Sequence, residues 1–240
     1  MKKMVFRIFA STFLLVFAIC DAWATSYNPA TEFSITNNPS GVWTYGYAAT
    51  PGGTFTPYTS SCIGCVNGTN EESWFYSAAD GWGPNVEYNN GGYYNDSNVV
   101  FDAYQLAVVA GGVGNSFTGE LIFTAPSAGN YYESGDFTGD QYGIGTNVGI
   151  ITPTGTVFSS SVTSVGEIVP FEDSDYLNAG QQIIFYVSPG SGTQNTGLDL
   201  DINYTATPES SSALYLLLGG SVLLGFVLYR RLSHCAIGTF

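Results

Sequence analysis

Residues 196–205 read TGLDLDINYT, in which apolar and polar side chains alternate with a period of two. In an extended chain, successive side chains point to opposite faces. The Leu, Ile and Tyr side chains of this stretch therefore share one face, and the Asp and Asn side chains share the other. This pattern predicts a β-strand with one buried and one exposed face.

The segments before it have a similar character. Residues 183–187 form a continuous apolar run of strand length. Val148, Ile150 and Val157 mark further strand candidates on either side of a turn at residues 153–155, which read PTG. Branched side chains favour strands, and Pro and Gly favour turns. We therefore expect several short strands separated by turns.

The middle of the chain, residues 25–206, shows no convincing helical period. Its length is sufficient for one sizeable hydrophobic core. We predict a single all-β domain, a jelly-roll-like β-sandwich, over residues 25–206. Residues 59–97 are rich in Gly, Asn, Ser and aromatic residues. We interpret them as long loops between strands, where binding residues tend to lie.

The charges are divided unevenly along the chain. Its five Lys and Arg residues all lie near the two ends, and no Lys, Arg or His lies between Thr25 and Thr207. That interval contains all 19 Asp and Glu residues except Asp21 and Glu209. A domain so acidic is not expected to bind nucleic acid, because it has no cation to offer the phosphates. It also cannot assemble a Ser-His-Asp triad, a Lys base or an Arg clamp.

The N-terminal segment predicts a signal peptide over residues 1–24. A basic start is followed by an apolar run over residues 8–19 and by the sequence Ala-Trp-Ala, which ends at Ala24. Small residues at these positions suit cleavage by signal peptidase between Ala24 and Thr25. Cys20 offers a lipoprotein alternative, but the bulky Ile19 before it disfavours lipid attachment.

The C-terminal segment predicts one transmembrane helix over residues 213–229, a stretch of 17 residues without a charge. Arg230 and Arg231 follow it directly. Because basic residues flank the cytoplasmic side of membrane spans, residues 232–240 are expected to form a short cytoplasmic tail. The preceding domain would then lie outside the cytoplasm.

Thr207, Pro208 and Glu209, the apolar span and the Arg pair together resemble the bacterial PEP-CTERM sorting signal, here residues 207–231. The resemblance implies that an exosortase-like membrane enzyme recognises and cuts the tail. It also implies delivery to the cell surface or to an exopolysaccharide matrix. This chain departs from the family pattern at Ser210, where a second Pro is usual, and in its extension beyond the Arg pair. The alternative is an ordinary anchor that is never cleaved.

A second resemblance covers much of the middle domain. Four segments are similar to jelly-roll domains of the carbohydrate-binding-module type that often precede PEP-CTERM tails. These segments are residues 123–131, 135–139, 177–181 and 196–202. The resemblance implies the jelly-roll fold more strongly than it implies any ligand.

Aromatic and short polar side chains lie close together between residues 81 and 96. Flat aromatic rings stack on the C–H face of a pyranose, while amides and carboxylates pair with its hydroxyl groups. This composition makes the segment our candidate polysaccharide-binding surface. Its candidate residues are Trp82, Tyr88, Tyr93, Tyr94 and Asn95. The alternative is that these rings only hold a long loop against the sandwich.

Acidic clusters in two segments suggest calcium as the one candidate cofactor, because calcium binds six to eight oxygen atoms. The candidate ligands are Asp136, Asp140, Glu172, Asp173 and Asp175. An acidic surface that is merely solvated is the alternative interpretation.

Cys62 and Cys65 are the only cysteines between residues 25 and 206. In an exported protein such a pair predicts a local disulfide. A zinc site would need two more ligands, and the domain has neither His nor another Cys to supply them.

Together these patterns predict a non-enzymatic, exported surface or extracellular-matrix protein that binds polysaccharide and is sorted through its C-terminal membrane signal. Two alternatives remain open. One is a glycoside-active enzyme, because a glycosidase needs only a pair of carboxylates. The other is a purely structural matrix component without a specific ligand.

Overall fold

The computed structural model describes the middle of the chain as one compact unit. The described residues are 24–65, 70–77, 83–96, 98–111, 116–192 and 195–206. Residues 1–23 of the predicted signal peptide lie outside them, as do the predicted sorting signal, the transmembrane helix and Trp82; Ala24, the last residue of the predicted signal peptide, is the first described residue. The expected first residue of the mature chain, Thr25, lies in the first strand and pairs with Tyr204.

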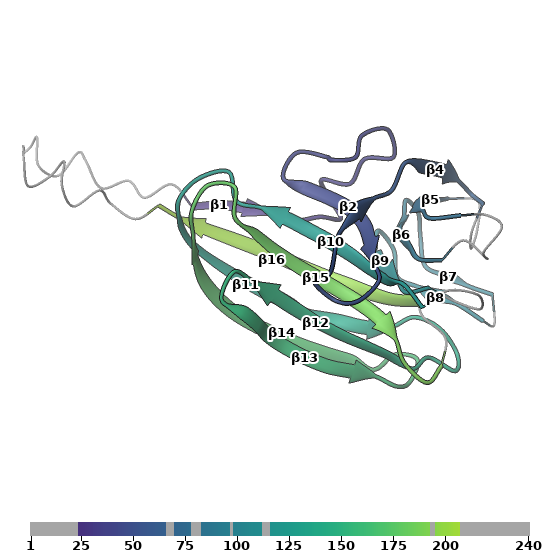
Figure 1. Ribbon diagram of the computed structural model, residues 1–240. Coiled ribbons are helices and arrows are strands. Elements are labelled where there is room, and N and C mark those ends of the chain that lie inside the picture. Colours follow the sequence, from purple (N-terminus) through teal and green to yellow (C-terminus); the bar gives the residue numbers. More distant parts are fainter. Residues whose placement is uncertain are drawn as a thin grey trace, which may run out of the picture. The chain divides into compact units, whose positions relative to one another are not determined.

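Strands make up two large antiparallel sheets (Figure 1). The first sheet has eight described strands. In spatial order they are β14 (Ile168–Leu177), β11 (Gly129–Gly139), β16 (Asn195–Thr205), β9 (Leu106–Val109), β6 (Asn85–Asn89), β5 (Glu71–Phe75) and β4 (Ser60–Ile63), with β1 (Ala24–Tyr27) paired to the C-terminal end of β16.

The second sheet has six described strands. In spatial order they are β13 (Gly155–Val162), β12 (Thr146–Thr152), β15 (Gln182–Pro189), β10 (Thr118–Thr124), β2 (Trp43–Ala48) and β3 (Thr56–Pro57). A small hairpin of β7 (Tyr94–Asn95) and β8 (Val100–Phe101) is separate from both sheets. From β10 onward the chain crosses repeatedly from one sheet to the other, as it does in Greek-key sandwiches.

The hydrophobic core lies between the two large sheets. Leu198, Leu200 and Ile202 of β16 are fully buried in one cluster with Phe123 of β10 and Phe185 of β15. The alternating polar residues of β16 point to the opposite, outer face of the first sheet. The strand prediction for residues 196–205 is therefore confirmed, and so is the coarser prediction of an all-β sandwich.

The prediction of long loops over residues 59–97 is wrong in part, because the segment contains the strands β4, β5, β6 and β7. β5 and β6 were missed because their outer face buries polar rather than aliphatic side chains. Glu71 and Ser73 of β5 and Glu87 of β6 are each less than 5% exposed. On the inner face, Trp74 packs into the core.

The β7–β8 hairpin covers part of the outer face of the first sheet. Val99 and Phe101 pack with Ala107 of β9 in a second hydrophobic cluster, and Tyr94 lies against it. Ala107 pairs with Glu87, so the cluster lies on the same face as the buried polar side chains. β9 is consequently buried on both faces.

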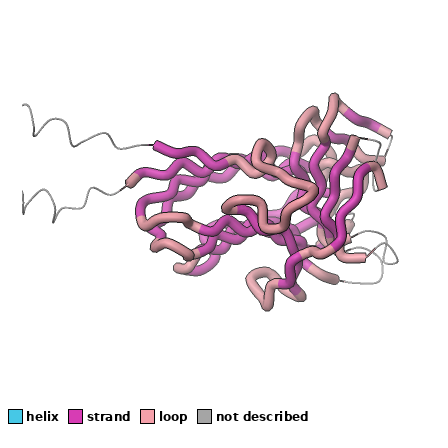
Figure 2. The backbone as a smooth tube through the Cα atoms, turned by 90° about the horizontal axis from the view of Figure 1, so that it is seen from above, coloured by secondary structure: helices cyan, strands magenta, loops and turns pink. Residues whose placement is uncertain are grey.

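Figure 2 shows only strands and loops in the described part of the chain. None of the described residues belongs to a helix long and apolar enough to cross a membrane.

Candidate functional site

Two loops that flank the β7–β8 hairpin are tied together by one buried amide. Asn89, at the end of β6, donates from Nδ2 to the carbonyl oxygen of Gly92 at 3.0 Å and to that of Asp102 at 2.7 Å. The backbone N–H of Tyr104 donates to the carbonyl oxygen of Gly91 at 3.3 Å. These bonds hold the loop before the hairpin beside the loop after it.

The turn of the hairpin is closed by Asp96. Its Oδ1 accepts from the backbone N–H groups of Asn98 at 2.9 Å and Val99 at 2.8 Å. Its Oδ2 accepts from the hydroxyl of Tyr94 at 3.1 Å. These N–H donors lower the pKa of Asp96 because they stabilise its charged form. The hairpin therefore presents a fixed, ionised carboxylate at its tip.

Exposed aromatic rings accompany this polar frame. Tyr93 and Tyr104 are each 63% exposed. The amide of Asn95 donates to the hydroxyl of Tyr93 at 3.2 Å. Tyr104 is the only non-glycine residue in the described part with a left-handed backbone, at φ 59°. Such strain is uncommon and often accompanies functional loops. We name the set Tyr93, Tyr94, Asn95, Asp96 and Tyr104 the hairpin surface.

The structure brings together only some of the predicted sugar-binding residues. Tyr93, Tyr94 and Asn95 lie on the hairpin surface. Tyr88 points to the inner face of β6 and stacks on Phe33, with ring centroids 5.4 Å apart. Tyr104 was not predicted. The signal that could have found it is an exposed aromatic residue next to the Asn- and Gly-rich segment.

A group of three carboxylates lies at the other side of the first sheet. Glu133 of β11 pairs directly with Asp173 of β14, and Asp175 pairs with Tyr131. The side chains of Tyr131 and Glu133 share one face because the two residues are two apart along β11, and the same holds for Asp173 and Asp175 along β14. Since the two pairs are cross-strand partners, all four side chains point to the inner face. One oxygen from each of Glu133, Asp173 and Asp175 lies within 4.8 Å of the other two. We name these three residues the inner carboxylate cluster.

The innermost member, Glu133, is fully buried, and neither of its carboxylate oxygens has a hydrogen-bond partner. Burial, with the carboxylates of Asp175 and Asp173 nearby, raises the pKa of Glu133 to about 8. Burial also raises the pKa of the half-buried Asp175, although a hydrogen bond from Thr152 opposes the shift. The cluster therefore holds negative charge poorly without a positive partner.

The five predicted calcium ligands separate into different places. Asp173 and Asp175 belong to the inner carboxylate cluster. Glu172 points to the outer face and accepts from the hydroxyl of Tyr132. Asp136 is also on the outer face, where it pairs with Asp199 of β16. Asp140 is buried near the hairpin, and its Oδ1 accepts from Gln105 Nε2 at 3.3 Å.

Glu133 was not among the predicted ligands. In sequence it is 40 residues from Asp173, and only the pairing of β11 with β14 brings the two together. A signal existed nonetheless. Glu133 occupies an inward position between Tyr131 and Phe137, where the alternation calls for an apolar residue.

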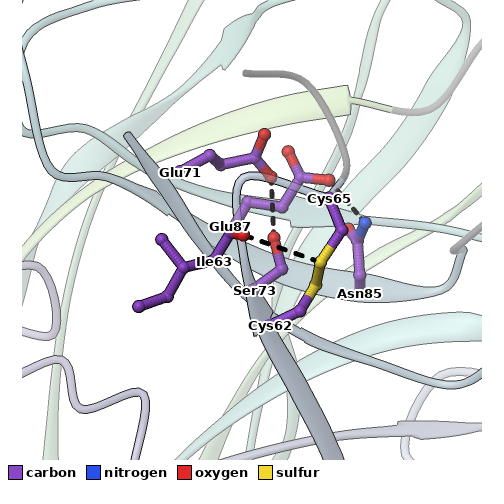
Figure 3. The surroundings of a disulfide bond; sticks show 7 residues. All are labelled: Cys62, Ile63, Cys65, Glu71, Ser73, Asn85 and Glu87. Carbon is purple, nitrogen blue, oxygen red and sulfur yellow. Dashed lines mark hydrogen bonds between the residues drawn. A yellow bond between two sulfur atoms is a disulfide. The ribbon is translucent and has the colours of Figure 1, made fainter. Parts of the chain in front are cut away.

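Cys62 and Cys65 are joined by a disulfide at the end of β4 (Figure 3). Beside it lie buried polar side chains of β5 and β6, and Cys62 is the cross-strand partner of Ser73. Ser73 donates to Glu71 Oε1 at 2.7 Å, and the amide of Asn85 donates to Glu87 Oε1. We name these four residues the outer polar pocket. Its two carboxylates thus have donors within the protein.

No family model matches the chain, and no curated protein matches it. Solved structures with a similar arrangement of strands include carbohydrate-binding modules. A family 35 carbohydrate-binding module from Clostridium thermocellum is 17% identical, with a TM-score of 0.29, over 54% of this chain and 96% of the module. A second one, from Paenibacillus barcinonensis, is 14% identical, with a TM-score of 0.29, over 77% and 99%.

The K1 cleaved adhesin domain of Lys-gingipain from Porphyromonas gingivalis is 9% identical, with a TM-score of 0.35, over 77% of this chain and 99% of that domain. Likenesses this distant say nothing about the ligand of this chain. The sandwich described above rests on the pairing of its own strands.

Proposed function

We propose that this chain is a non-enzymatic, exported protein of the cell surface or extracellular matrix, and that its sandwich binds polysaccharide through the hairpin surface. The observation that carries the proposal is the exposure of Tyr93 beside the amide of Asn95 on a hairpin with a fixed Asp96 carboxylate, together with the exposure of Tyr104 on the loop that follows the hairpin. Sugar recognition combines an aromatic platform with a few positioned polar groups.

The pre-organised backbone supports the same conclusion. Asn89 holds the two flanking loops, and Asp96 closes the turn, so the surface exists before a ligand arrives. A binding surface that is already ordered avoids the entropy cost of ordering on association. A loop that merely covers the sheet would gain nothing from presenting two tyrosine rings to water.

The composition of the domain favours binding over catalysis. Residues 25–206 contain no Lys, Arg or His, so carboxylates are the only strong acid or base groups there. A glycosidase would have to be built from them alone. A reducing-sugar assay on the same polysaccharides tests that alternative, and release of product would contradict the non-enzymatic proposal.

Export and sorting form the other half of the proposal. The basic and apolar segments at the two ends support passage through signal peptidase and handling by an exosortase-like enzyme. Expression of the full chain with and without the Arg230 and Arg231 pair tests this route. Cell fractionation should then show a change in surface or matrix location.

The binding test is gel retardation of the purified full chain by a panel of bacterial and plant polysaccharides. Tyr93→Ala and Tyr104→Ala, which replace the two exposed rings, should each reduce retardation at least tenfold in apparent affinity, while circular dichroism stays unchanged. The matched control is Tyr176→Ala, because Tyr176 is 53% exposed on β14, away from the hairpin. Trp82→Ala belongs in the same series, since Trp82 was predicted for this surface.

Loss of retardation only in the Tyr176 variant would move the binding surface to the outer face of β14. No retardation of the folded wild-type chain by any polymer would favour the structural matrix component instead.

A further inference from the structure

We propose that the inner carboxylate cluster, Glu133 with Asp173 and Asp175, binds a calcium ion beside the edge strand β14. The ion would join β14 to β11 across the inner face of the first sheet. This site is separate from the hairpin surface and does not depend on sugar binding.

The first argument is the absence of any internal counter-charge. Residues 25–206 contain no Lys, Arg or His, so no ion pair within the domain can neutralise these carboxylates. Glu133 is fully buried, and both of its oxygens are without hydrogen-bond partners. One oxygen each of Asp173 and Asp175 is in the same condition. Buried polar atoms of native proteins are almost always satisfied, and a bound ion is one standard reason for an apparent exception.

The second argument is geometric. Oxygens that bind one calcium ion lie about 2.4 Å from it, so ligands on opposite sides are separated by about 5 Å. One oxygen from each of the three carboxylates lies within 4.8 Å of the others. A single ion can therefore reach all three. The strand register fixes this arrangement, because Glu133 and Asp173 are direct cross-strand partners.

The third argument concerns which ion fits. Three carboxylates can supply up to six oxygens, and the hydroxyl of Thr152 lies within hydrogen-bond reach of Asp175. Calcium accepts such a set of six to eight oxygens in flexible geometry. Magnesium demands a near-ideal octahedron and keeps several waters, whereas zinc prefers nitrogen and sulfur ligands.

The site also has a route for entry. Asp173 and Asp175 are only partly buried, and β14 is the edge strand of the first sheet, with no further described strand paired beyond it. An ion can therefore reach the cluster from the solvent at the sheet edge. Glu133 closes the inner end. This arrangement differs from the acidic outer face, where water can solvate each carboxylate.

The test is calorimetric titration of the chelator-treated full chain with CaCl₂ and, separately, with MgCl₂. Terbium luminescence gives a second measurement, since Tyr131 lies on the same face and can sensitise a bound lanthanide. We expect one calcium per chain, a melting temperature several degrees higher with calcium than with chelator, and at least tenfold weaker binding of magnesium.

Asp173→Asn and Glu133→Gln should each weaken calcium binding at least tenfold and abolish the calcium-dependent rise in melting temperature. Asp175→Asn provides a third variant at a more exposed position, in case the other two fold poorly. The matched control is Asp136→Asn. Asp136 lies on β11, as Glu133 does, but on the outer face, so its replacement should leave calcium binding unchanged.

Absence of calcium binding by the folded wild-type chain at millimolar calcium would overturn the proposal. Equal calcium binding by Asp173→Asn and the wild type would do the same, as would tighter binding of magnesium than of calcium.

Discussion

The outer polar pocket and the inner carboxylate cluster both bury glutamate in a domain that has no cation, yet they differ in their donors. In the pocket, Ser73 donates to Glu71 and Asn85 donates to Glu87. In the cluster, neither carboxylate oxygen of Glu133 has a hydrogen-bond partner from another residue. The protein itself thus supplies hydrogen bonds to the carboxylates of the pocket, whereas the carboxylates of the cluster need a bound ion or proton to offset their charge.

This difference teaches how an acidic domain can tolerate buried carboxylates. Burying an ionised group is costly unless it is paired or hydrogen-bonded. A chain without internal cations has three remedies, namely protein donors, bound protons and bound metal ions. The pocket uses the first, and the proposed calcium ion would supply the last.

Glu120 of β10 combines features of both sites, because one of its carboxylate oxygens has a donor and the other has none. Its substitution is expected to have the largest effect on the unfolding free energy. Glu120 is fully buried, its Oε1 accepts from the backbone N–H of Gly52 at 2.9 Å, and its Oε2 has no partner. Burial raises the pKa of Glu120 to about 7 from its ordinary 4.5. A raised carboxyl pKa stabilises the fold fully below about pH 4.5, and this contribution is lost as the pH rises to about 7.

Glu120→Gln removes this titration. We therefore expect the unfolding free energy of the wild type to fall by about 3 kcal/mol more than that of the variant between pH 4 and pH 8. Urea unfolding at a series of pH values measures the difference. Parallel pH profiles for the two proteins would show that Glu120 is not protonated in the fold.

Ser73→Ala sharpens the comparison directly, because it removes the donor to Glu71 and leaves a buried carboxylate under-satisfied. The expected cost is about 2 kcal/mol of unfolding free energy. The cost should be the same with calcium and with chelator, since the outer polar pocket is not the proposed metal site.

The control is Ser174→Ala on the exposed face of β14, which should change stability by less than about 0.5 kcal/mol. A calcium-dependent cost for Ser73→Ala would mean that the pocket, too, depends on an ion.

The disulfide beside the pocket gives the smallest effect. Cys62 and Cys65 are three residues apart, and the bond closes only a short loop at the edge strand β4. A short loop loses little entropy when it is closed, so replacing both residues by Ser should cost about 1 kcal/mol. A loss of several kcal/mol in thermal unfolding would show that the disulfide holds the outer polar pocket in place.

The sequence predicted the strands whose alternation follows the usual rule of apolar side chains inside. β16 is the best example, with Leu198 and Leu200 facing the core and Asp199 facing outward. β5 and β6 were missed because both of their faces are buried and one of them is polar. Local alternation cannot reveal a polar face that a neighbouring hairpin or loop will cover.

The candidate sites could likewise be predicted only where their residues are neighbours in sequence. Tyr93, Tyr94 and Asn95 could be grouped as a candidate surface from the sequence, because neighbours in sequence share one hairpin; that they bind sugar stays a prediction. Glu133 was missed because its partners come from another strand, 40 residues away. Tyr88 was placed with the sugar-binding residues by composition, but the alternation of β6 turns its ring toward Phe33.

β16 also has a mechanical consequence. Its first residue, Asn195, is hydrogen-bonded to Asp140 beside the β7–β8 hairpin, whereas its last residue, Thr205, pairs with Ala24 at the far end. The strand has 11 residues and so spans roughly 35 Å. Because β11 and β9 bond to it laterally, a pull along β16 loads many backbone hydrogen bonds in shear at once. A load held at the hairpin and transmitted to Thr205 would have to break these bonds together rather than one after another.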